Sequence, residues 1–260
     1  MNTGFTDIDQ LVDGFNSGDL IIIGGRPSMG KTAFALNIAW QAATNADAKV
    51  LLFSLDMSTI QIGQRFLAIE LEIELEKTKI EKLDRQQNFY VMQDGLSRLS
   101  TTDIYVDDTS DLKIMEIKNK CSRLKAEKGL DIIIVDYLQL MNIDGQEKHR
   151  KKEITALSRA FKQLAIEMDC PIVLLSQLFR SPERRSGDAK RPLLSDLWGS
   201  RTLEMSADLV LLLYRDEYYN PYTPKENLAE VIIAKNKYGS TGTVELTFIG
   251  NMNKFAEIQK

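Results

Sequence analysis

The sequence predicts an α/β fold in which a mostly parallel, doubly wound sheet carries helices on both faces. Short apolar runs alternate with longer amphipathic stretches, a glycine-rich loop joins the first run to the first helix, and polar residues stand where several runs end. The expected strands are residues 20–24, 49–55, 103–106, 131–136, 171–177, 208–214, 230–235 and 243–249. A glycine-containing turn separates the last two, so these are expected to form a C-terminal hairpin.

The apolar spacing also places the helices. They are expected at residues 33–43, 60–76, 84–100 and 151–168. Ser58 stands where it can cap the second of these helices. Residues 1–19 precede the first strand as a lead-in segment that packs against the rest. No repeat, low-complexity tract or linker interrupts the 260 residues, which predicts one domain over residues 1–260.

Composition narrows the class of protein. Hydrophobic residues at 43% and charged residues at 27% are ordinary for a globular protein, and no apolar run approaches the ~20 residues of a membrane-spanning helix. The N-terminus has no signal-peptide pattern, so the expected location is the cytoplasm, or the stroma or matrix of an organelle, without a membrane partner. Cys121 and Cys170 are expected to be buried thiols, and His149 lies in a charged run. These patterns argue against disulfide, zinc and Ser-His-Asp chemistry.

The net charge of −4 bears on nucleic-acid binding. A protein that coats duplex DNA is usually basic overall, so the balance argues against nonspecific wrapping. It still permits a local basic groove, or a ring in which only the pore is basic.

The glycine-rich loop matches a phosphate-binding motif. Gly25, Gly30, Lys31 and Thr32 fill the fixed positions of G-x-x-x-x-G-K-[ST] between a predicted strand and helix. Glycines let successive backbone N–H groups point at a phosphate, and the helix N-terminus adds partial positive charge. Lys31 would reach the β- and γ-phosphates and Thr32 would ligate Mg²⁺, so ATP and Mg²⁺ are the predicted ligands. The candidate nucleotide-binding loop residues are Gly25, Arg26, Pro27, Ser28, Met29, Gly30, Lys31 and Thr32.

Polar residues at other strand ends support the same site. Gly24, Asp56, Asp136 and Gln177 each fall at or just after the carboxyl end of an expected parallel strand, the edge where ligands bind in open α/β sheets. Asp136 is a candidate for the Mg²⁺ shell. Gln177 can reach a γ-phosphate or the attacking water, or it can simply end its strand.

A basic segment follows the fifth strand. Residues 179–196 form either a solvated surface loop or a mobile loop that tracks a nucleic-acid backbone, and the sequence does not separate these interpretations. Trp198 can stack on a base or pack inside the protein. The candidate DNA contacts are Arg180, Arg184, Arg185, Trp198, Gly199 and Arg201.

Together these segments resemble the C-terminal, RecA-like motor domain of DnaB-type replicative DNA helicases. The segments that carry the resemblance occur in the family's order and span nearly the whole chain: residues 3–9, 26–35, 53–58, 134–141, 175–178, 190–197, 213–219 and 234–237. The match over 213–219 adds Arg215 to the candidate nucleotide-binding set. The resemblance implies a RecA-like P-loop NTPase fold and a homohexameric ring that hydrolyses ATP between subunits and moves 5′→3′ on single-stranded DNA.

The resemblance also implies roles for single residues and partners. Lys31 and Thr32 would hold phosphate and Mg²⁺, Asp136 would be the Walker B acid, and Gln177 would sense the γ-phosphate. Lys235 and Lys237 would reach into the neighbouring subunit's site. With Asp56, these give the candidate catalytic set: Lys31, Asp56, Asp136, Gln177, Lys235 and Lys237. Replication proteins such as primase or a helicase loader are implied partners. The family's N-terminal domain has no counterpart in the 260 residues.

Several positions depart from the family pattern. Asp56 stands where the family has a glutamate base, which shortens the side chain by about 1.5 Å. Lys237 stands at the arginine-finger position, and lysine lacks the planar guanidinium fork. Residues 198–201 replace the family's Arg-Glu-Ser-Gly pore loop, and residues 205–206 replace Gln-Asp. These changes suggest the hypothesis that ATP binding is retained while hydrolysis and DNA coupling are weakened.

Three functions are therefore compared. The first is a helicase motor, and the second is an ATP-binding, helicase-like subunit that regulates a true helicase without strong unwinding. The third is a RecA-like recombinase or clock-type ATPase, against which the matches over residues 190–197 and 213–219 count.

Overall fold

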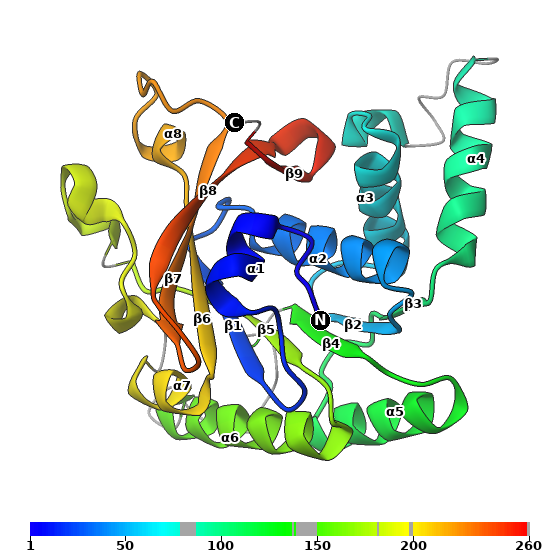
Figure 1. Ribbon diagram of the computed structural model, residues 1–260, viewed down its shortest axis with the longest axis horizontal. Coiled ribbons are helices and arrows are strands. Elements are labelled where there is room, and N and C mark those ends of the chain that lie inside the picture. The colour runs from blue at the N-terminus through cyan, green and yellow to red at the C-terminus, as the bar shows by residue number, and fades with distance from the viewer. Residues whose placement is uncertain (79–86, 137, 139–149, 181, 198–199, 259–260) are drawn as a thin grey trace.

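A single mixed sheet forms the centre of the molecule (Figure 1). The computed structural model describes residues 1–78, 87–136, 138, 150–180, 182–197 and 200–258. Within this part of the chain, the sheet has nine strands in the order β3-β2-β4-β5-β1-β6-β7-β8-β9. The strands are β1 (Leu20–Gly25), β2 (Val50–Ser54), β3 (Ile104–Asp107), β4 (Ile132–Asp136), β5 (Ile172–Gln177), β6 (Leu209–Tyr214), β7 (Leu228–Asn236), β8 (Gly242–Ile249) and β9 (Lys254–Glu257).

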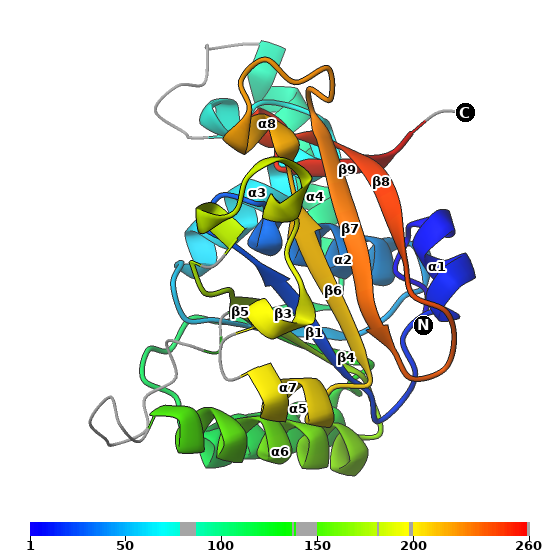
Figure 2. The same cartoon turned by 90° about the vertical axis from the view of Figure 1, so that its left-hand side faces the viewer.

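The type of strand pairing changes once across the sheet. Strands β1 to β6 pair in parallel, whereas β7, β8 and β9 add to the β6 edge as antiparallel strands. The long β6, β7 and β8 strands lie side by side in Figure 2. The predicted α/β fold, mostly parallel sheet and C-terminal hairpin are thus confirmed, and the sequence interpretation missed only β9 among the strands.

Helices cover both faces of the sheet (Figure 1). α1, α2 and α3 pack on one face with α4 outside α3, while α5, α6 and α7 pack on the other. The helices are α1 (Thr6–Val12), α2 (Lys31–Asn45), α3 (Thr59–Leu71), α4 (Gln87–Thr101), α5 (Ile114–Glu127), α6 (Arg150–Met168), α7 (Ser200–Ser206) and α8 (Asp216–Tyr219). Short 3₁₀ turns lie at η1 (Leu75–Thr78), η4 (Pro182–Arg184), η5 (Gly187–Lys190), η6 (Leu194–Asp196) and η7 (Gly250–Met252).

Two hydrophobic cores follow from the apolar strands. Successive side chains of a strand point to opposite faces, so a strand buried on both faces must be apolar throughout. In β1, Ile21 and Ile23 join the core under α2, and Leu20 and Ile22 join the core over α6. This double burial fixes the strand that delivers the glycine-rich loop.

The second predicted helix starts as expected and ends early. Ser58 Oγ accepts from the Gln61 N–H at 3.4 Å, and the Gln61 side chain accepts from the Ser58 N–H at 2.9 Å. This capping box confirms the predicted role of Ser58. The helix stops at Leu71, because Glu72 adopts a left-handed conformation with φ 53°, and 3₁₀ turn η1 follows. The expectation of a continuous helix to residue 76 was therefore wrong.

The chemistry of the cysteines agrees with the sequence interpretation. Cys121 and Cys170 are free and buried, and burial raises the pKa of each thiol to about 12. At neutral pH both are protonated and unreactive. His149 lies outside the described residues. No helix in the described ranges is long and apolar enough to cross a membrane.

Candidate functional site

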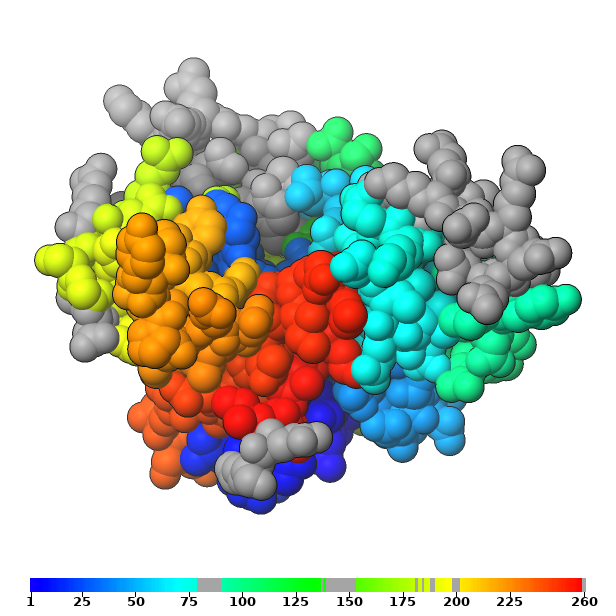
Figure 3. Space-filling model, turned by 90° about the horizontal axis from the view of Figure 1, so that it is seen from above, coloured from blue at the N-terminus to red at the C-terminus, as the bar shows by residue number. Residues whose placement is uncertain are grey.

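The glycine-rich loop forms a cradle between β1 and α2. Ser28 and Gly30 have positive φ angles of 63° and 90°, which turn the backbone between the strand and the helix. The positive φ angle favours glycine at position 30, and a Cβ there would also come within 3.1 Å of the Phe255 ring. Figure 3 shows this part of the chain (blue) recessed between the segment around α8 (orange), β8 and β9 (red), and α3 (cyan).

Thr32 and Asp136 meet at the mouth of this cradle. The Thr32 hydroxyl donates to Asp136 Oδ2 at 2.6 Å, although the two residues come from α2 and the end of β4. Burial raises the pKa of Asp136, and the Thr32 hydrogen bond and the charge of Lys31 act in the opposite direction. A hydroxyl and a carboxylate are hard oxygen ligands, so this pair fits a Mg²⁺ ion.

Lys31 lies beside the same pair. Its Nζ donates to the Arg26 carbonyl at 3.2 Å across the loop. Burial lowers the pKa of Lys31 to about 8, and the charge of Asp136 partly opposes this shift. The amine is therefore mostly protonated at neutral pH but poorly solvated, and a phosphate would supply the missing counter-charge.

The other predicted strand-end residues gather at this edge. Gln177 lies opposite Gly25 in the β1–β5 register, and Ser54 lies opposite Asp136 in the β2–β4 register. Asp56 follows Ser54 by two residues and is exposed, and the N–H of the intervening residue donates to the Asp136 carbonyl at 2.8 Å. The predicted convergence of Gly24, Asp56, Asp136 and Gln177 is therefore present in the fold.

Two arginines of the predicted nucleotide set hold the loop in place. Arg26 pairs with Glu183 at 2.6 Å and donates to the Leu178 carbonyl at 2.9 Å. Arg215 donates to the Ser28 carbonyl at 2.9 Å, pairs with Glu217, and lies 4.5 Å above the Phe248 ring centroid. Both guanidinium groups therefore contact the protein in this structure, and they fix the shape of the loop from two sides.

Lys235 and Lys237, the two lysines expected to act on a neighbouring subunit, lie at the end of the sheet where the parallel strands begin, opposite the glycine-rich loop. Asn236, which lies between them in the chain, pairs with Leu209, and Leu209 pairs with Ile21 at the start of β1. The glycine-rich loop follows the other end of β1, and a strand of this length spans roughly 17–20 Å. Lys235 and Lys237 therefore cannot reach the loop of their own chain.

Both lysines have partners at that edge. Lys235 Nζ donates to the carbonyls of Glu204 and Ala207, at the end of α7, at 2.6 and 2.5 Å. Lys237 Nζ pairs with Asp208 Oδ1 at 2.8 Å and stays more than half exposed. Asp208 is 2% exposed and also accepts from the Leu20 N–H and from Lys162. The buried carboxylate thus holds an exposed ammonium group at the surface.

The structure describes the candidate DNA contacts only in part. Arg180 is exposed, whereas Arg185 pairs with the buried Asp196 and therefore supports the loop. The side chains of Arg184 and Arg201, like all of Trp198 and Gly199, lie outside the described residues. The choice between a solvated loop and a DNA-tracking loop stays a prediction.

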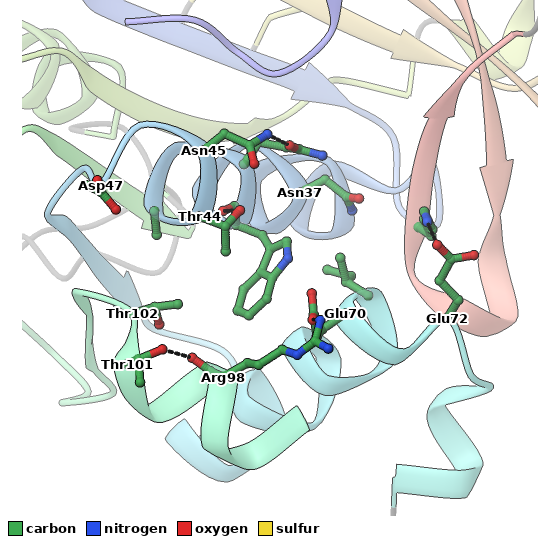
Figure 4. A pocket seen from close by; sticks show the side chains of 14 residues that line it. Asn37, Thr44, Asn45, Asp47, Glu70, Glu72, Arg98, Thr101 and Thr102 are labelled. Atoms are coloured by element: carbon green, nitrogen blue, oxygen red, sulfur yellow. Dashed lines mark hydrogen bonds and ion pairs between the residues drawn. The ribbon is translucent and has the colours of Figure 1, made fainter. Parts of the chain in front are cut away.

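A separate polar cavity lies away from the phosphate loop (Figure 4). It has a volume of about 500 Å³ between the C-terminal halves of α2, α3 and α4. Two ion pairs line it, Arg98 with Glu70 at 2.9 Å and Lys254 with Glu72 at 2.6 Å. None of the candidate site residues belongs to its lining.

Four residues at or behind the site were missed by the sequence interpretation: Arg65, Glu183, Asp208 and Asn253. Glu183 pairs with Arg26, and Asp208 pairs with Lys237. Both acids lie far from their partners in the sequence, so these pairs can be recognised only once the fold is known. Arg65 lies on an amphipathic helix, where arginine is common, and no local pattern distinguishes it.

A glycine-rich loop that opens a helix at Lys31 and Thr32, beside a buried acid on a nearby parallel strand, defines a nucleotide-binding α/β domain of the P-loop class. The DnaB-like helicase C terminal domain model matches residues 1–257, and the chain belongs to that family.

Individual relatives agree with this assignment. The replicative DNA helicase DnaB of Geobacillus stearothermophilus is 44% identical over 259 residues, which cover 99% of this chain and 56% of that protein. The replicative DNA helicase DnaC of Bacillus subtilis (strain 168) is 42% identical over the same shares. The chain thus spans about half the length of the curated relatives it matches.

Solved structures show the same fold. One solved ATPase domain superposes with a TM-score of 0.93 at 35% identity, covering 99% of this chain and 90% of that one. A DnaB-like replicative helicase, described with its interactions with primase, superposes with a TM-score of 0.92 at 35% identity, covering 99% and 61%. The predicted resemblance is confirmed over the whole chain.

Proposed function

We propose that this chain is one motor domain, residues 1–260, that hydrolyses ATP where two copies meet and uses the energy to move along single-stranded DNA and unwind duplex. The observation that carries the proposal is the placement of Thr32 and Asp136 at one edge of the sheet and of Lys237 at the other. A complete site then needs the loop of one copy and the lysines of the next.

Each residue has a part in this proposal. The loop and Lys31 bind the phosphates of ATP, and Thr32 with Asp136 would hold Mg²⁺, which when bound neutralises charge on the phosphates. Asp56 accepts a proton from the attacking water, and Gln177 contacts the γ-phosphate. Lys235 and Lys237 of the adjacent copy stabilise the charge that develops during transfer.

The proposal extends to partners and place. Its ring, hexameric by family resemblance, would enclose single-stranded DNA near Arg180 and the neighbouring candidate contacts. The similar helicase described with its primase interactions supports a primase partner for this chain too, and a helicase loader is a further candidate. The protein would work where DNA is replicated, in the cytoplasm or in the matrix or stroma of an organelle.

Steady-state ATPase measurements test the proposal. We expect turnover at protein concentrations that allow assembly, and we expect single-stranded DNA to raise it several-fold, because DNA binding in a ring aligns neighbouring sites. The same assay should be repeated with duplex DNA as control. ATP binding without turnover, with or without DNA, would instead support the regulatory subunit, and it would contradict the motor.

A second expected result concerns the two family departures. We propose that Asp56 and Lys237 reduce hydrolysis, because the base is shorter and the finger lacks a guanidinium fork. The double variant Asp56→Glu, Lys237→Arg should raise kcat by about 10–100-fold. The single variants allow the two effects to be separated, and Lys118→Arg on α5 serves as a neutral control. An unchanged or lower kcat in the double variant would show that the native pair is already adapted.

A further inference from the structure

Asp208, which immediately precedes β6, is bound to the first residue of β1 by two hydrogen bonds. Its N–H donates to the Leu20 carbonyl at 2.9 Å, and its Oδ2 accepts from the Leu20 N–H at 3.0 Å. The same oxygen accepts from Lys162 Nζ on α6, which also donates to the Gly18 carbonyl at 2.7 Å. Asp208 is only 2% exposed, so α6 and the start of β1 fix the position of its carboxylate.

The other oxygen of this carboxylate has a different kind of partner. Oδ1 accepts from Lys237 Nζ at 2.8 Å, and the Lys237 N–H donates to the Asp208 carbonyl at 2.9 Å. Asp208 therefore binds both the backbone and the ammonium group of this lysine. Oδ2 joins Asp208 to the fold, whereas Oδ1 holds the end of a side chain that is 55% exposed.

An aromatic ring flanks the same ammonium group. The centroid of the Tyr238 ring lies 5.4 Å from Lys237 Nζ, within the range of a cation–π contact. The Tyr238 hydroxyl donates to Asp19 Oδ1 at 2.7 Å, and Asp19 is 3% exposed. The ring is thus anchored to the segment that leads into β1, and the Lys237 ammonium group has a fixed neighbour on a second side.

The charges explain why this arrangement holds the lysine without burying it. Burial acts to raise the pKa of Asp208, but the hydrogen bonds from Lys162 and Lys237 outweigh this effect and lower the pKa. The carboxylate is therefore ionised at neutral pH. A lysine side chain is a flexible four-carbon chain, so a fixed anion at its end restricts the positions that its charge can take. The cation stays accessible at the surface.

We propose that Asp208 is a positioning residue that holds the ammonium group of Lys237 where it can meet the phosphates bound by the adjacent copy. The inference rests on the proposed function, in which Lys237 acts on a neighbouring site, and deepens it. Lys162 stays bonded to Oδ2, so the carboxylate keeps a counter-charge when Lys237 moves toward a phosphate. Asp208 acts through Lys237 and does not touch the nucleotide.

The first test removes the charge of Asp208 and keeps its size. Asp208→Asn should lower kcat about 10–100-fold, because a displacement of about 1 Å in a group that acts on the transition state has an effect of this size. KM should stay within about twofold, because the loop that binds ATP is unchanged. Glu167→Gln removes a carboxylate paired with Lys118 at 2.6 Å between α6 and α5, and this matched control should behave as the unmodified protein does.

Mixed assemblies show at which end of the sheet Asp208 acts, since it also contacts β1, which leads to the loop of its own copy. Two variants with different affinity tags are co-expressed and purified through both tags, so every assembly contains both chains. Asp208→Asn with Lys31→Met should recover turnover above the mean of the two alone, because the sound loop of one meets the sound Lys237 of the other. Asp208→Asn with Lys237→Ala should show no recovery, because neither chain supplies a positioned Lys237.

A stability comparison separates positioning from a general loss of structure. Lys162→Gln weakens the bonding of Asp208 at Oδ2 and leaves the pair between Oδ1 and Lys237 in place. It should lower the urea midpoint of unfolding, whereas kcat should fall less than about threefold. A loss of kcat as large as that in Asp208→Asn would show that Asp208 serves only the fold, and it would overturn the inference.

The outcomes also separate this inference from the proposed function. If Lys237→Ala keeps the turnover of the unmodified protein, the proposed role of Lys237 fails. If Lys237→Ala loses turnover and Asp208→Asn keeps it, only the inference fails. Recovery of Asp208→Asn with Lys237→Ala, but not with Lys31→Met, would place the defect in the loop of its own copy and overturn the inference. Recovery in neither mixture, where Lys31→Met and Lys237→Ala do restore each other, would overturn it too.

Discussion

Replacing Lys31 with methionine is expected to abolish ATP turnover and to stabilise the unliganded protein. The amine lies where a nucleotide's phosphates would sit, so its loss should lower turnover by about 100-fold or more. The same group is poorly solvated, with a pKa of about 8 against an ordinary 10.5. Below pH 8 the folded protein holds a charge in a place that disfavours it, and this costs on the order of 3 kcal/mol. Methionine keeps the stem and removes the charge.

The direction of the Lys31 pKa shift determines how the free energy of unfolding changes with pH. Between about pH 8 and 10.5 the unfolded chain binds more protons at Lys31 than the folded one, so the Lys31 contribution makes the free energy of unfolding rise with pH over this window. In Lys31→Met that contribution is absent. Urea unfolding at pH 7 and pH 10 measures the free energy of unfolding of the unmodified protein and of Lys31→Met. The control is Lys118→Met, which removes a partly exposed lysine paired with Glu167. Wild-type turnover, or a less stable Lys31→Met protein, would contradict the expectation.

Mixing two inactive variants is expected to restore activity. Lys31→Met has a defective loop and intact trans lysines, and Lys237→Ala has the reverse. If the site forms between copies, random assembly of equal amounts places a sound loop against a sound lysine at about a quarter of the interfaces. ATPase activity of the mixture should therefore exceed the mean of the two variants measured alone.

The matched control is a mixture in which no intact loop can meet an intact Lys237. Lys31→Met mixed with the double variant Lys31→Met, Lys237→Ala has no sound loop in any copy, so activity should stay at the background level. A mixture of the two single variants that also stays there would mean that Lys237 acts within its own chain or that copies do not exchange. Labelled protein followed by fluorescence transfer distinguishes these two outcomes by showing exchange directly.

Sequence reasoning identified the phosphate edge because its signals are local. Gly30, Lys31 and Thr32 are fixed by the backbone of one turn, and Asp136 ends an apolar run that had to be a buried strand. The parallel arrangement of these strands then brought distant residues to one edge without any knowledge of the contacts.

Other parts depend on contacts that no local pattern records. The apolar spacing of α3 continues past Leu71, yet Glu72 adopts a left-handed conformation that ends the helix. Strand β9 is four residues long and packs through Phe255 against Phe248 of the neighbouring strand and against Phe34, which lies far earlier in the chain. Arg65 meets Asn253 across 188 residues, a pairing that only the folded protein shows.

The two unlike edges of the sheet also give the molecule a direction. If the loop of one copy meets the lysines of the next, as proposed, the contact is head to tail and repeats until it closes into a ring or continues as an open helix. In an open stack, the loop of one terminal copy has no neighbouring copy to supply lysines. The lysines of the copy at the other end have no neighbouring loop to complete. In the proposed ring, closure would remove both ends, so every nucleotide site would be complete and a DNA strand along the ring axis would meet copies that all face the same way.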